Sequence, residues 1–225
     1  MGEVIRKDAA ADDIAADGNT TLANAAAKGG AWKQLVDERL GPTMALYTKI
    51  VADISQVEAD LMPLLAVIKA TDEENDDFLG AKADEMWNLI GRPAFDAAYS
   101  LVWPGGSATY ADGPDDEQPE RMELLAEILT ANLHPKIDPG WASALANDVR
   151  ARAKAYRAHI AAAHPHRSKL SLLKRMKGTM ARAAQMEIAR LKRRYLAEGF
   201  TEADIHQVIP DRPRSKPAKP EAPPA

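Results

Sequence analysis

Apolar residues recur at steps of three and four along most of the chain, which is the spacing of helices that bury one face. Three stripes show this pattern: Tyr47, Ile50, Ile54, Val57, Leu61, Leu64 and Ile68; Trp141, Leu145, Val149, Ala153, Tyr156 and Ile160; and Leu173, Met176, Met180, Ala184, Ile188, Leu191 and Tyr195. The first stripe keeps a seven-residue repeat, which fits a seam inside a bundle or a short coiled coil between two chains. We predict an all-α fold, a helical bundle of about six to eight helices.

Glycine and proline indicate where these helices should bend or end. Pro63 lies inside the first stripe and should kink its helix, because proline removes one backbone donor. Pro165 should end the helix of the second stripe. Gly199 fits the left-handed cap of a Schellman motif, in which Phe200 would pack back on Tyr195.

Capping residues predict three helix starts. Thr71 has a glutamate three residues later and should begin a new helix by a capping box. Asp138 precedes a proline and fits an N-cap with proline in the first turn. Thr201 should cap a short final helix in the same way.

Composition divides the chain into five predicted segments. Residues 1–30 are alanine-rich and interrupted by glycine, so we expect a frayed lead-in. An acidic helical bundle should span 31–103, a Gly/Pro/Asp linker 104–118, and a basic helical region 119–209. Residues 210–225 are rich in proline and should form a disordered tail.

Charge changes sign at the predicted linker. Residues 1–120 carry 9 Lys/Arg and 23 Asp/Glu, whereas residues 121–225 carry 20 and 10, so the two halves are oppositely charged. Between Val149 and Arg194 there are 14 basic residues and one acid. Such a stretch attracts an anionic surface, which can be nucleic acid, a membrane, a protein partner or the acidic half of the chain itself.

Composition also limits the chemistry and the location. The sequence has no cysteine, which excludes disulfides, thiolate metal sites and cysteine nucleophiles. It has no long apolar run and no signal-peptide pattern at its start, so we expect a cytoplasmic protein that does not use a membrane.

No local motif indicates an enzyme, a cofactor site or a metal site. The glycine patterns of nucleotide-binding loops are missing. Glu202 and His206 lie one helical turn apart, but a metal needs three or four ligands. His159, His164 and His166 cluster in sequence, where a solvated helix end is the preferred interpretation. We expect a protein without enzymatic activity, cofactor or metal.

The strongest candidate is a basic face on the last long helix, opposite its apolar stripe. It comprises Lys174, Arg175, Arg182, Arg190, Lys192 and Arg193. We interpret the chain as a structural or adaptor protein that assembles with its own copies or a protein partner through charged helix faces. The alternative is sequence-independent nucleic-acid binding through residues 149–194.

Overall fold

The structure is a computed structural model that describes residues 9–210, and eight α-helices account for most of these residues. The helices are α1 (Ala11–Lys28), α2 (Gly30–Arg39), α3 (Gly41–Leu89), α4 (Ala97–Val102), α5 (Ala108–Ala111), α6 (Gln118–Thr130), α7 (Pro139–Ala197) and α8 (Glu202–Val208). The predicted tail at 210–225 lies outside the described residues, apart from Pro210.

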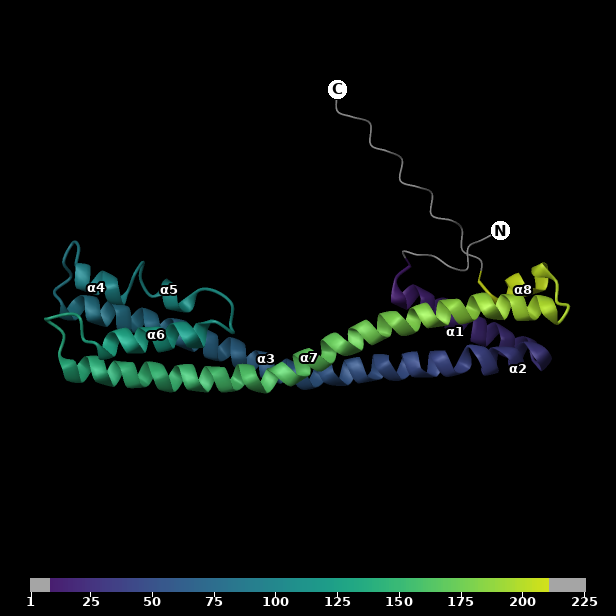
Figure 1. Cartoon of the computed structure of the whole chain (residues 1–225), viewed down its shortest axis with the longest axis horizontal. Coiled ribbons are helices and arrows are strands. Elements are labelled where there is room, and N and C mark those ends of the chain that lie inside the picture. The colour runs from purple at the N-terminus through teal and green to yellow at the C-terminus, as the bar shows by residue number, and fades with distance from the viewer. Residues whose placement is uncertain (1–8, 211–225) are drawn as a thin grey trace, which may run out of the picture. The chain divides into compact units, whose positions relative to one another are not determined.

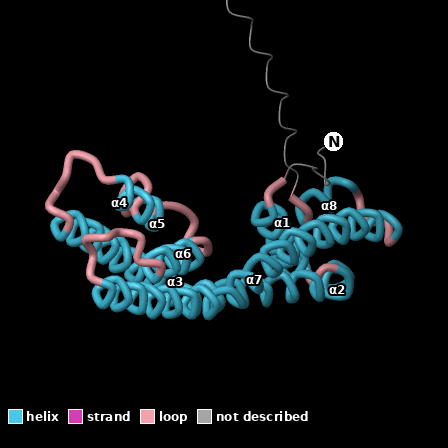
Figure 2. Tube along the Cα trace, turned by 60° about the vertical axis from the view of Figure 1, so that its left-hand side comes forward, coloured by secondary structure: helices cyan, strands magenta, loops and turns pink. Residues whose placement is uncertain are grey.

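The prediction of an all-α bundle with six to eight helices is confirmed. Within residues 9–210 the chain contains helices and connecting loops but no strand (Figure 2). None of the helices in this range is both long enough and apolar enough to cross a membrane.

The chain forms two compact units, each built on parts of α3 and α7. Unit 1 combines the two ends of the chain, described over 9–56 and 170–210. Unit 2 is the continuous segment 57–169. This division differs from the predicted boundary at 104–118, which lies inside unit 2. Glycine and proline mark turns there, yet Tyr110 and Gln118 are buried in that unit.

Helix α1 replaces the frayed lead-in that was expected for residues 1–30. It buries Ile14, Ala15 and Ala25 in the core of unit 1 and contacts α2 and α8. A Cβ atom on Gly18 would lie 2.6 Å from the sulfur of Met44, so this glycine permits the close approach of α1 to α3. Alanine and glycine give little hydropathy signal, but they allow helices to pack closely.

Aromatic side chains close unit 1 at the end of α7. Trp32 stacks on Phe200 at 3.9 Å between ring centroids, and the hydroxyl of Tyr195 donates to the backbone oxygen of Trp32. Gly199 has φ of 87°, and the amide of Phe200 donates to the carbonyl of Tyr195. The predicted Schellman motif with its Phe200–Tyr195 contact is therefore confirmed.

Unit 2 has its own core, formed where α4, α5 and α6 cover the unit's parts of α3 and α7 (Figure 1). Its largest fully buried side chains include Trp103, Met122 and Leu125. The indole nitrogen of Trp103 lies 3.3 Å from the sulfur of Met86, and the hydroxyl of Tyr110 donates to the carbonyl of Val102. These contacts fix the 104–118 segment on the unit.

Helix α7 continues through Pro165 and α3 continues past Thr71, although each of these positions was expected to be a helix boundary. Pro63 lies within α3 and Pro165 within α7, and both are exposed. The carbonyl that loses its partner belongs to Ala59 or Ala161, four residues earlier, and these residues are exposed too. Water can reach these carbonyls, which explains why the helices continue. Thr71 lies inside α3 and starts no helix.

The three predicted stripes form the buried faces of α3 and α7. Every member of the first stripe is buried except Leu64, which is half-buried. In the third stripe Met180 is half-buried, and Met176 is 41% exposed. Its position at the edge of the stripe, about 60° from Leu173, accounts for this difference.

Candidate interaction face on helix α7

The candidate basic face lies opposite the side of α7 that packs in unit 1. The buried side carries Ala184, Ile188 and Leu191. At about 100° per residue, Arg175, Arg182 and Arg193 fall within about 20° of one line on the opposite side. We call these three residues the arginine row; all of them are exposed.

The other three predicted residues flank this row. Lys174 and Arg190 are exposed, whereas Lys192 is half-buried and its ammonium lies 3.7 Å from a carboxylate oxygen of Glu202 in α8. Arg190 pairs with Glu187 one turn earlier on α7. The arginine row thus points away from the core, and two of the flanking cations, Arg190 and Lys192, lie beside acidic residues of unit 1.

Exposed apolar side chains share this side of α7, which the sequence interpretation missed. Met186 is 51% exposed and lies about 40° from Arg182 around the helix. Leu172, Met176 and Leu196 are also exposed on α7. The same helical projection places Met186 beside the arginines, but the predicted face was drawn from charged residues only.

Lys177 shows that part of the basic helix has an acidic partner within unit 1. Its ammonium lies 2.6 Å from a carboxylate oxygen of Asp12 in α1, and the hydroxyl of Tyr47 donates to the same carboxylate. Hydrogen bonds from Lys177 and then Tyr47 lower the pKa of Asp12. Burial, together with the Asp12 charge, raises the pKa of Tyr47.

The first part of the basic stretch packs within unit 2. Arg150 donates to the hydroxyl of Thr130 at 2.9 Å, and Arg157 lies 3.2 Å from Glu120 and 3.5 Å from Glu123. These contacts join α7 to α6. The other two arginines of the basic stretch before residue 170 also have partners in unit 2. Arg152 donates to Asn75 of α3, and Arg167 lies 3.8 Å from Asp115, which precedes α6.

The acidic run at 72–77 is divided between internal and exposed positions. Asp72 accepts a hydrogen bond from Tyr156, Asp76 accepts one from Gln118, and both carboxylates are half-buried. Burial and nearby carboxylates, Asp72 first, raise the pKa of Tyr156. Three acids of the run remain exposed on α3: Glu73, Glu74 and Asp77. We call them the acidic patch.

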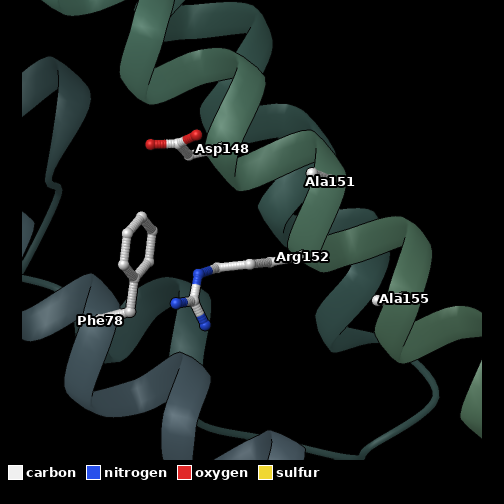
Figure 3. Close-up of a pocket in the computed structure, with 5 residues that line it drawn as sticks. All are labelled: Phe78, Asp148, Ala151, Arg152 and Ala155. Atoms are coloured by element: carbon white, nitrogen blue, oxygen red, sulfur yellow. The ribbon is translucent and has the colours of Figure 1, made fainter.

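Unit 2 also contains a groove between α3 and α7, with a volume of about 460 Å³. Figure 3 shows Phe78 of α3 and Arg152 of α7 facing each other, with Asp148 one turn earlier on α7. The guanidinium carbon of Arg152 lies 4.1 Å from the centroid of the Phe78 ring, which fits a cation–π contact. One cation and one anion line this groove, and its other lining residues are apolar.

The histidines and acidic runs assemble no metal site in the described part of the chain. His134, which the sequence interpretation did not single out, is buried and its Nε2 lies 3.2 Å from a carboxylate oxygen of Asp96. His159, His164 and His166 all lie on the continuous helix α7.

No family model, no curated protein and no solved structure matches this chain.

Proposed function

We propose that the protein is a non-enzymatic structural or adaptor protein that assembles through the α7 basic face. The observation that supports this proposal is the exposed arginine row with Met186 beside it. Arginine and methionine are both enriched in protein interfaces relative to the remaining surface. An exposed face of this kind offers apolar contact area together with charges that select an acidic partner.

The spacing of the row favours a protein over nucleic acid. The rise of about 1.5 Å per residue puts Arg182 about 10 Å from Arg175, and Arg193 about 16 Å further on. Three arginines along about 27 Å provide few phosphate contacts, whereas steep salt-dependent DNA binding needs about six to ten. The arginines before residue 170 pack within unit 2, and residues 57–169 carry 19 acids against 11 basic residues.

The partner that fits best is the acidic patch of a second copy. Glu73 and Asp77 lie one turn apart on α3, with Glu74 between them. Asp72 and Asp76 of the same acidic run are not part of the patch, because both accept hydrogen bonds inside unit 2. Nucleic-acid binding remains the alternative, and a cytoplasmic location remains a prediction.

Charge reversal tests the proposal. The triple variant Arg175→Glu, Arg182→Glu and Arg193→Glu should fall to a smaller mass in light scattering, because repulsion replaces attraction at the interface. A second triple variant, Glu73→Lys, Glu74→Lys and Asp77→Lys, should partly restore assembly when the two variants are mixed.

The control variant reverses three other exposed lysines, Lys49→Glu, Lys154→Glu and Lys169→Glu. It changes the net charge by the same amount and should leave the mass unchanged. Equal effects of both triple variants would contradict a specific interface. Binding of random duplex DNA that weakens steeply with salt and is lost in the arginine variant, at unchanged mass, would favour the alternative.

A further inference from the structure

The side-chain amide of Gln118 is buried in unit 2, and its oxygen accepts no hydrogen bond from the described residues. Gln118 is the first residue of α6 and is only 1% exposed. Its Nε2 donates to Oδ1 of Asp76 at 2.9 Å and to the backbone oxygen of Ala111 at 3.3 Å. Its Oε1 has no partner among the described residues. Buried polar atoms are nearly always paired, so this oxygen needs an explanation.

The neighbouring carboxyl group can supply the missing donor only when it carries a proton. An ionised carboxylate only accepts hydrogen bonds, whereas a carboxylic acid both donates and accepts. A carboxylic acid and a carboxamide can therefore pair through two bonds: the amide N–H to one oxygen of Asp76, and the acid O–H to Oε1. The first of these two bonds is present at 2.9 Å.

The surroundings of Asp76 disfavour its ionised form. Asp72 and Asp77 flank it on α3, and Asp112 lies at the end of α5. Burial is the largest cause that raises the pKa of Asp76, followed by the charge of Asp72, and the hydrogen bond from Gln118 opposes both. The ordinary way to relieve a buried charge of this kind is to bind a proton.

Other charged groups of the surrounding helices are already engaged. On α7, Tyr156 donates to Asp72 and Arg152 donates to Asn75. On α6, Arg121 contacts Glu117 and the backbone oxygen of Asp112. The charge of Asp115 contributes to the raised pKa of Tyr156, and its carboxylate lies 3.8 Å from the guanidinium of Arg167. Within the described residues no cation pairs directly with Asp76.

We propose that Asp76 and Gln118 form a proton-gated clasp, which closes when Asp76 is protonated and donates to Gln118. The clasp joins α3 to the start of α6, and through Ala111 to α5. When Asp76 loses its proton, one of the two bonds is lost and the like charges repel. The 104–118 segment is then less firmly attached to unit 2. The carboxyl O–H bond of Asp76 breaks in this step and its proton passes to water, while no other covalent bond changes.

The sign of the pH effect follows from the raised pKa. A carboxyl whose pKa is higher in the folded protein than in the unfolded chain binds protons more strongly when folded. The attachment of 104–118 should therefore strengthen as the pH falls from neutral through the folded-state pKa of Asp76. It should weaken again only when carboxylates of unit 2 that have a lowered pKa, such as Glu85, become protonated.

The test is hydrogen exchange of the full-length protein, followed by mass spectrometry of peptides that cover 104–121. After correction for the intrinsic rate, opening in the natural protein should decrease by at least about twofold as the pH is lowered from 7 to 5, the direction set by the raised pKa of Asp76. Asp76→Asn supplies a permanent N–H donor for Oε1. In this variant, opening of 104–121 should be as slow at pH 7 as at pH 5.

Asp77→Asn is the matched control, because it removes one neighbouring charge but offers Gln118 no donor. It should keep the pH dependence of the natural protein. Gln118→Met removes the amide, and opening of 104–121 at pH 5 should then be faster than in the natural protein.

Two results would overturn the proposal. One is exchange in Asp76→Asn that still depends on pH as in the natural protein. The other is a ¹³C titration of labelled aspartates in which Asp76 ionises at or below the ordinary aspartate value. Far-ultraviolet circular dichroism at both pH values identifies any variant that fails to fold, and the titration, which uses only the natural protein, is then decisive.

Discussion

Substitution of Ile14 by alanine tests whether the N-terminal helix belongs to the core of unit 1. Ile14 is 2% exposed, and the N-cap position Ala10 offers α1 no side-chain hydrogen bond. The helix therefore depends on packing rather than on local capping. Truncation of a buried isoleucine costs about 2–5 kcal/mol, and the better helix propensity of alanine returns only a few tenths. If α1 were frayed instead, the substitution should not measurably change the free energy of unfolding.

The assay must report on unit 1 alone. Trp32 is the tryptophan of unit 1, whereas Trp87, Trp103 and Trp141 lie in unit 2. Fluorine NMR of protein labelled with 5-fluorotryptophan follows each indole through a urea titration. With a slope of about 2 kcal/mol per molar urea, the transition seen at Trp32 should move down by about 1–2 M.

Leu46→Ala provides the control, since this leucine is 44% exposed on α3 in the same unit. It should change the free energy of unfolding by about 0.5 kcal/mol or less. Equal shifts for the two variants would refute the assignment of α1 to the core. So would an unchanged Trp32 transition in Ile14→Ala.

Two further pairs of substitutions test backbone features. Gly178→Ala should stabilise the protein by about 0.5–1 kcal/mol, because a Cβ there meets nothing within 4 Å on α7, whereas Gly199→Ala should destabilise it by about 1–2 kcal/mol because of its φ of 87°. Urea titrations should show changes of opposite sign in the free energy of unfolding for these two variants. Changes of the same sign would contradict the helix cap at Gly199. Pro63→Ala should raise the thermal midpoint by restoring one helical hydrogen bond, worth up to about 3 kcal/mol, while Pro42→Ala in the first turn of α3 should change little.

Local patterns predicted those parts of the fold that depend on neighbouring residues. Apolar spacing found the buried faces of α3 and α7, and Gly199 and Asp138 were correctly interpreted as a cap and a helix start. Pro165 misled the prediction because the effect of a proline on a helix depends on exposure. Pro63 and Pro165 both face solvent, which no local pattern shows.

In the candidate site, too, some features follow from the local sequence and others depend on residues far away in the chain. The angular position of the arginine row follows from helical geometry and needed no structure. Which cations already have partners depends on residues far along the chain: Lys177 pairs with Asp12, and Lys192 approaches Glu202 only because the chain turns at Gly199. The hydrogen bond between Asp76 and Gln118 likewise links residues separated by 42 positions, with α4 and α5 between them, so spacing could not reveal it.

The division of unit 1 between distant segments determines the order in which a growing polypeptide can complete its structure. Unit 2 is continuous and has all of its residues once position 169 has emerged from the ribosome. Ile14 must wait for its partners around Ile188, which at 5–20 residues per second takes roughly 10–35 s. During that interval the apolar side of α1 lacks its final cover and is available to chaperones. Synthesis that stops near residue 170 should therefore yield a folded unit 2 with an incomplete and aggregation-prone unit 1.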